Sequence, residues 1–146
     1  MAASWVCFVR WSGCNAPARV PSGGVTRPNI AWGEVTIDCV EPERVATFWG
    51  ALLDAPSQNH GQPGWFRVGP LLAGGPVINF QPVPEPKIGK TRIHLDVWTD
   101  DLGGAATLVE RLGGRKIGAM GEDPEGVGLV LADPEGNEFC LVALRG

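Results

Sequence analysis

The chain has 146 residues, of which 44% are hydrophobic and 19% are charged, a composition typical of one globular domain or of two small half-domains that share a core. Sixteen acidic and twelve basic residues give a net charge of −4 without any Lys/Arg-rich run, so nucleic-acid binding through phosphate contacts is not expected. No apolar run approaches the ~20 residues that cross a bilayer, so we expect no contact with a membrane interior. The 21 glycines and 13 prolines predict many turns and short elements.

The first 28 residues differ in composition from the rest of the chain. They are rich in Gly, Pro, Ser and Ala, and Arg10 interrupts their apolar run, which is not typical of a signal peptide. We predict that residues 1–28 are a mobile or poorly packed extension that folding does not require, and that a single domain covers residues 29–146. Because the four cysteines contain no CxxC pair, we expect free thiols and a cytoplasmic location. These cysteines are Cys7, Cys14, Cys39 and Cys140.

Residues 33–40 predict the first strand of the domain, because apolar and polar side chains alternate along them. Glu41 and Pro42 follow, and proline is favoured at the first position of a helix. The next apolar residues are spaced as one face of a helix, at i, i+3, i+4 and i+7. They are Val45, Phe48, Trp49 and Leu52. Short strands are then predicted at residues 55–59, 65–68 and 76–82.

The same pattern returns sixty residues later. Leu95 and Val97 correspond to Val35 and Ile37, and Asp101 takes the place of the acidic residue at the helix start. The second helical stripe is Ala105, Leu108, Val109 and Leu112. Strands follow at residues 115–119, 127–132 and 138–144, with a tight turn at 133–137. The sequence therefore predicts two equivalent strand–helix–strand–strand–strand modules, residues 33–82 and 90–146, joined by the proline-rich linker 83–89.

Four stretches of this pattern match a known family. They are residues 38–49, 80–87, 92–97 and 132–140. In these stretches the chain resembles the vicinal oxygen chelate superfamily, which includes glyoxalase I, bleomycin-resistance proteins and extradiol dioxygenases. Within this superfamily it is most similar to the bacterial glyoxalase-like domain branch, and it looks like an actinobacterial member. The resemblance implies an α+β fold in which two paired βαβββ modules form a curled mixed sheet around a cleft, with the helices on the outside. It does not imply one reaction, since this scaffold carries several chemistries and plain binding.

Candidate site residues follow from the repeat and from the resemblance. Glu34 and His94 occupy equivalent positions opposite the helix-packing faces of their strands, so both are expected to point toward the concave side. In metal-bearing members of the superfamily, side chains from the first and last strands of each module bind the metal. The resemblance implies that these positions are held here by Glu34, Gln81, His94 and Cys140. Carboxylate, imidazole and thiolate groups can bind Zn, Fe, Mn or Ni, but Cys140 stands where a glutamate is usual.

Further residues are expected to bind a small molecule in the cleft. Asn79 and Gln81 are candidates for hydrogen bonds to it, and Asp96 for orienting His94 or for pairing with Arg92. Aromatic side chains often line apolar pockets. The candidates of this kind are Trp65, Phe66 and Trp98. Structural roles remain open: His94 as a hydrogen-bonded residue of the cleft wall, and Cys140 as a small buried hydrophobe.

Two functions are therefore predicted, and a structural domain with a collapsed cleft is the third alternative. The first is a small-molecule-binding protein whose cleft holds an organic ligand without a metal, as in resistance-type members. The second is a metal-dependent enzyme, a lyase, isomerase or dioxygenase, in which Glu34 acts as the catalytic base and one divalent ion polarises the substrate. The unusual ligand set favours the first. Because paired modules leave sheet edges free, we also expect a homodimer.

Overall fold

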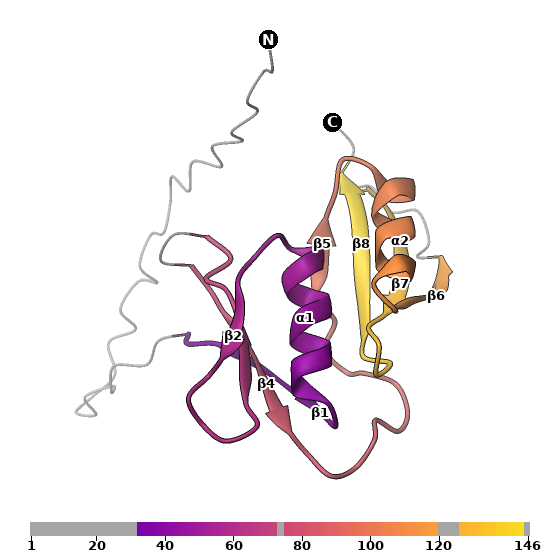
Figure 1. Cartoon of the computed structure of the whole chain (residues 1–146). Coiled ribbons are helices and arrows are strands. Elements are labelled where there is room, and N and C mark those ends of the chain that lie inside the picture. The colour runs from indigo at the N-terminus through magenta and orange to yellow at the C-terminus, as the bar shows by residue number, and fades with distance from the viewer. Residues whose placement is uncertain (1–31, 73–74, 120–125, 145–146) are drawn as a thin grey trace, which may run out of the picture. The chain divides into compact units, whose positions relative to one another are not determined.

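The computed structural model describes residues 32–72, 75–119 and 126–144, and the predicted extension at 1–28 lies outside them. Figure 1 shows the order of the elements along this part of the chain. Module one contains β1 (Val35–Cys39), α1 (Pro42–Leu52), β2 (Ser57–Asn59), β3 (Phe66–Val68) and β4 (Ile78–Pro82). Module two contains β5 (Asp96–Trp98), α2 (Leu102–Arg111), β6 (Arg115–Ala119), β7 (Gly126–Ala132) and β8 (Glu138–Leu144).

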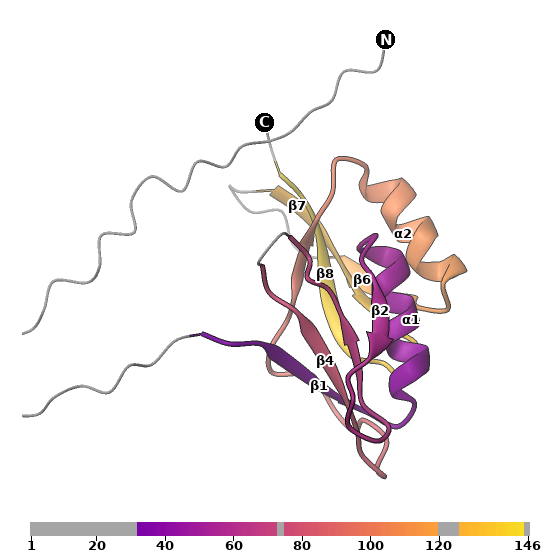
Figure 2. The same ribbon diagram turned by 60° about the vertical axis from the view of Figure 1, so that its left-hand side comes forward.

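Each module folds its four strands into one mixed sheet with the same topology. Sheet one has the order β1-β4-β3-β2, and sheet two has the order β5-β8-β7-β6. In each sheet the first strand pairs in parallel with the last, and the other neighbours are antiparallel. The predicted α+β fold of paired βαβββ modules is confirmed. In the view of Figure 2, both helices lie on one side of the strands.

Both helices begin at the positions that the sequence analysis singled out. Pro42 is the first residue of α1. Asp101 caps α2, because its Oδ1 accepts a hydrogen bond from the backbone N–H of Gly104 at 2.9 Å. Gly113 follows α2 with a φ of +95°, a left-handed conformation that glycine adopts most easily. In the described residues, neither helix is long and apolar enough to cross a membrane.

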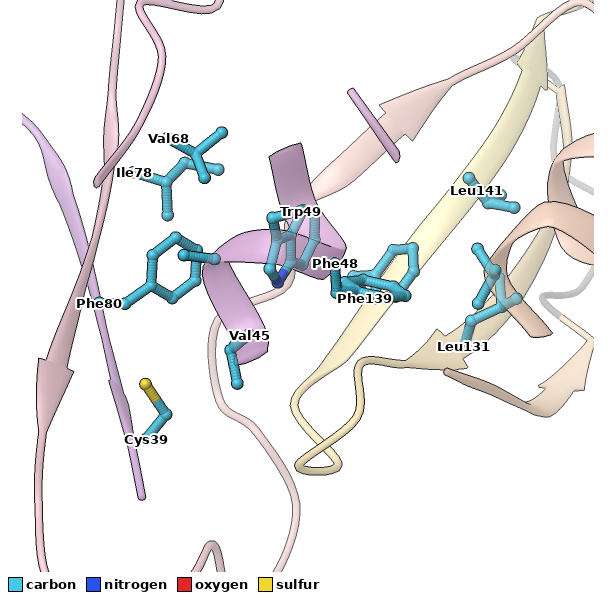
Figure 3. Packing of buried hydrophobic residues seen from close by; sticks show 12 residues of the cluster. Cys39, Val45, Phe48, Trp49, Val68, Ile78, Phe80, Leu131, Phe139 and Leu141 are labelled. Carbon is cyan, nitrogen blue, oxygen red and sulfur yellow. The ribbon is translucent and has the colours of Figure 1, made fainter. Parts of the chain in front are cut away.

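The hydrophobic core continues from module one into module two through α1 (Figure 3). On one side of α1, Phe80 of β4 is completely buried. On its other side, the ring of Phe139 in β8 lies 6.1 Å from that of Phe48 and 4.9 Å from that of Trp49. These aromatic pairs join the two modules in one core. Within α2, by contrast, only Val109 is buried.

The turn between β7 and β8 also joins the modules. Asp133 is completely buried, and its carboxylate accepts hydrogen bonds from the backbone N–H groups of Glu135 and Asn137 and from the Asn137 side chain. The indole N–H of Trp49 in α1 donates to the same carboxylate at 3.3 Å. The Glu135 carboxylate accepts from the backbone N–H groups of Val40 and Glu41, at 2.8 and 2.6 Å, where α1 begins. Module two therefore supplies the N-terminal cap of α1 that Glu41's own side chain does not form.

The buried thiol of Cys39 should make the free energy of unfolding depend on pH. Its thiol is 2% exposed, and burial, with the nearby carboxylates of Glu135 and Asp133, raises its pKa from 9.0 to about 12. In the unfolded chain the thiol ionises above about pH 9, whereas in the folded protein it keeps its proton. The free energy of unfolding should therefore fall as the pH rises above 9, by up to ~1.4 kcal/mol per pH unit from this group.

Urea unfolding of the wild type and of Cys39→Ala between pH 8 and pH 10.5 measures this effect (roughly the range over which an unfolded thiol ionises). Loss of the core side chain makes the variant less stable at pH 8, and this difference should narrow as the pH rises. All other titrating groups are common to the two proteins. Stability curves that stay parallel over the whole range would contradict a buried, protonated thiol at this position.

Candidate functional site

Sheet one has one apolar face and one polar face. Ile37 and Cys39 of β1 belong to the apolar side that packs in the core, and strand alternation places Val35 on the same side. Thr36 and Asp38 therefore lie on the other side. The strand register places Thr36 beside Asn79, Asp38 beside Gln81, and Arg67 of β3 beside Asn79. We call this side of the sheet the polar face. Its residues are Glu34, Thr36, Asp38, Arg67, Asn79 and Gln81.

Three side chains of the polar face form a connected cluster. The Arg67 guanidinium donates through Nη2 to Glu34 Oε1 at 3.2 Å and through Nε to Asn79 Oδ1 at 3.0 Å. The Asn79 amide donates to the other Glu34 oxygen. Asn79 is 4% exposed, while the Glu34 and Arg67 side chains are 42% and 29% exposed. Both oxygens of Glu34 are therefore engaged, and a cation of the chain itself balances its charge.

Arg67 was not among the residues that sequence reasoning selected. A usable signal was present, because Phe66, Arg67 and Val68 alternate as in a strand that is buried on one side. The alternation places Arg67 opposite the core-packing Phe66 and Val68. The alternation does not reveal how the strands pair. β4 lies between β3 and β1 in the sheet, and this arrangement brings Arg67 to Glu34, which is 33 residues away in the sequence.

The predicted residues of module two form a second, smaller group. His94 Nδ1 lies 3.6 Å from the Cys140 sulfur, and Asp96 is the cross-strand neighbour of Cys140. Burial raises the pKa of the Cys140 thiol above 9.0, and the Asp96 carboxylate raises it further. At neutral pH the thiol is therefore protonated. It is neither an activated nucleophile nor a ready thiolate ligand.

The other predicted binding residues are more dispersed. Gln81 is half-buried on the polar face, and Trp98 in β5 is 66% exposed. Trp65 lies beside His60, with ring centroids 5.6 Å apart. Phe66 packs against the core on the side opposite Arg67, because strand alternation turns it toward α1. The structure thus brings Glu34 together with Asn79, and His94 together with Cys140.

The donor set does not fit a divalent metal ion. In the described part of the chain, no three His, Cys, Asp or Glu side chains are grouped closely enough to hold one. The Glu34 oxygens are occupied by Arg67 and Asn79, the Cys140 thiol keeps its proton, and a Gln81 amide is a weak neutral donor. We therefore derive no chemical step through a metal.

The fold is shared with several solved structures. A glyoxalase/bleomycin resistance protein/dioxygenase family enzyme from Burkholderia phytofirmans PsJN matches with a TM-score of 0.64 and 17% identity, over 77% of this chain and 98% of that chain. A second match is a variant of the fosfomycin resistance protein FosX from Listeria monocytogenes, solved in complex with Mn(II) and 1S,2S-dihydroxypropylphosphonic acid. Its TM-score is 0.63 and its identity 13%, over 79% of this chain and 92% of that chain. A glyoxalase family protein from Bacillus anthracis matches with a TM-score of 0.60 and 14% identity, over 82% of this chain and 100% of that chain.

At these identities the likeness concerns the fold, and no curated protein matches the chain. Sequence comparison with protein families identifies the family itself. The model of the glyoxalase-like domain matches residues 34–142, which include both modules and the linker between them. The match agrees with the duplicated βαβββ topology of the two sheets. The chain therefore belongs to the glyoxalase-like domain family, within the vicinal oxygen chelate superfamily.

Proposed function

We propose that this protein binds a small organic molecule on the polar face of sheet one and that binding does not require a metal ion. The observation that supports this most strongly is the engagement of Glu34 by Arg67 and Asn79. The Arg67 guanidinium neutralises this carboxylate and would compete with a metal ion for it. On the polar face, the positive charge that pairs with Glu34 is the guanidinium of Arg67.

The polar face offers groups that suit an oxygen-bearing ligand. Arg67 is part-exposed, and within the described residues its Nη1 group makes no hydrogen bond. Thr36 and Asp38 are exposed on β1, and Gln81 is half-buried beside them. A carbonyl or hydroxyl group of a ligand can accept a hydrogen bond from Arg67 and exchange further hydrogen bonds with these neighbours. We expect Arg67 to be the residue whose removal weakens binding most.

A screen of small carbonyl- and hydroxyl-bearing compounds by ¹H–¹⁵N NMR tests this proposal. Compounds that bind should shift the amide signals of Arg67 and Asn79, and Arg67→Ala should abolish these shifts. Arg44→Ala is the matched control, because it also removes an arginine paired with a glutamate, at an exposed site on α1. Shifts that remain in Arg67→Ala, or that cluster away from sheet one, would contradict the proposed site.

The second candidate is a metal-dependent lyase, isomerase or dioxygenase that uses Glu34 as base. It is favoured by the likeness to FosX, which was solved with Mn(II). Titration of Mn(II) into the protein, followed by electron paramagnetic resonance, separates the two candidates. We expect no one-to-one binding by the wild type or by Arg44→Ala, since Arg67 competes with the ion for Glu34. Stoichiometric Mn(II) binding by the wild type would establish the second candidate instead.

We also propose that the protein is a cytoplasmic homodimer. Among the residues that the structure describes, each sheet ends in edge strands with one unpaired side, and Trp98 on the edge strand β5 is 66% exposed. Both features support association of two copies. Cys39 and Cys140 are free thiols, which suits a reducing compartment. Light scattering should give twice the chain mass of 15.5 kDa. A mass of one chain at micromolar concentration would contradict the dimer.

A further inference from the structure

A cavity of about 580 Å³ lies between the two modules, and of the residues of the polar face only Thr36 and Asp38 line it. It is bounded by the edge of β1, by the linker that leads to module two, and by the start of β8. Four consecutive residues of β1, 35–38, line it, so this strand presents its edge to the cavity. Its volume falls within the ~300–1,000 Å³ typical of small-molecule pockets.

None of the residues that sequence reasoning assigned to the site lines this cavity. Glu34, Asn79 and Arg67 lie outside its walls, as do His94 and Cys140. A ligand here would therefore touch the polar face only at Thr36 and Asp38, and it would lie apart from the cluster of Glu34, Arg67 and Asn79.

Contacts with Glu138 hold the linker wall in place. Its Oε2 accepts a hydrogen bond from the backbone N–H of Thr91 at 2.9 Å, and its own N–H donates to Thr91 Oγ1 at 3.3 Å. Its Oε1 lies 3.9 Å from the Lys87 ammonium, which donates to the carbonyl of Gly89 at 2.6 Å. The wall is therefore formed by the protein itself before any ligand enters, which lowers the cost of binding.

The chemistry of the lining defines the kind of ligand. The walls include the half-buried Val35, Ile37 and Leu95, with the aromatic rings of Trp49 and Phe139 behind them. The charged lining residues are three acids and three bases, so their charges cancel. They are Asp38, Glu85, Glu138, Lys87, Lys90 and Arg92. An apolar interior with a rim of zero net charge favours an uncharged ligand over an anion or a cation.

We infer that this cavity is a second binding site, specific for a neutral, mainly apolar organic molecule. N-phenylnaphthylamine, a neutral probe that fluoresces in apolar surroundings, should bind the full-length protein saturably with one molecule per chain. Anilinonaphthalene sulfonate, a related anion, should bind more weakly. Val35→Phe and Leu95→Phe fill the cavity from module one and from module two, and each should weaken binding of the neutral probe by about tenfold or more.

Two control variants show whether a loss of probe binding is specific to the cavity. Ile117→Phe adds similar bulk at a half-exposed position on β6 outside the cavity, and Arg67→Ala disables the polar face. Both should bind the neutral probe as the wild type does, so a failure of the proposed function would leave this result unchanged. Circular dichroism checks that each filled variant folds, and either one suffices if the other does not. Absence of saturable binding, tighter binding of the anion, or unchanged affinity in a folded filled variant would overturn the inference.

Discussion

Asp133→Ala is expected to lower the free energy of unfolding by about 4 kcal/mol. The substitution removes a completely buried carboxylate that accepts hydrogen bonds from two backbone N–H groups, from the Asn137 amide and from the Trp49 indole. Each donor that stays buried without an acceptor costs ~1–3 kcal/mol. The loss also loosens the turn that carries Glu135 to the N-terminus of α1.

Urea unfolding measures this loss, and Asp101→Ala is the matched control. Asp101 is an exposed aspartate that accepts one backbone hydrogen bond as the cap of α2, so its removal should cost only about 1 kcal/mol. Asp133→Asn keeps one oxygen acceptor, so its loss in the free energy of unfolding should lie between those of the two alanine variants. It replaces Asp133→Ala in the comparison if that variant is too unstable to measure. Equal losses for Asp133→Ala and Asp101→Ala would show that the buried turn does not join the modules energetically.

Phe139→Ala is expected to cost about 3–5 kcal/mol. Phe139 is 1% exposed, and its ring contacts those of Phe48 and Trp49, which belong to the other module. Truncation leaves a cavity where the cores of the two modules meet, and the surrounding rings can fill it only in part.

Thermal unfolding followed by calorimetry tests this prediction, with Ile117→Ala as the control. Ile117 is a half-exposed hydrophobic residue on β6, and its truncation should change the stability by about 0.5 kcal/mol or less. Phe139→Ala should still unfold in one transition, because Asp133 and Glu135 continue to join the modules. Two separate transitions would show that the aromatic contact alone makes the chain one cooperative unit.

The elements of the fold could be read from the sequence because their signals are local. Pro42, the stripe that begins at Val45 and the cap Asp101 all act within a few residues of their own positions. The predicted strand 138–144 agrees with β8, and the predicted turn 133–137 precedes it. The offset of sixty residues gave a second, independent copy of each signal, which is why the duplicated architecture was predicted correctly.

The candidate site was harder to predict because its contacts are long-range. Alternation identifies the outward side chains of β1 and β4, but Arg67 meets Glu34 only through the pairing of three strands. The turn around Asp133 was recognised as a hairpin turn, whereas its hydrogen bond to Trp49 depends on how the modules pack. For the same reason the sequence does not show that Phe66, predicted to line a ligand pocket, is partly buried and packs against the core.

The metal content of the protein, purified without an affinity tag and measured by inductively coupled plasma mass spectrometry, tests the central claim most directly. If Arg67 holds Glu34 as the structure shows, Zn, Fe, Mn and Ni should each be present far below one equivalent per chain. Near-stoichiometric content of any of these metals would contradict the account. It would mean that the pairing of Arg67 with Glu34 does not keep a metal ion out of the protein.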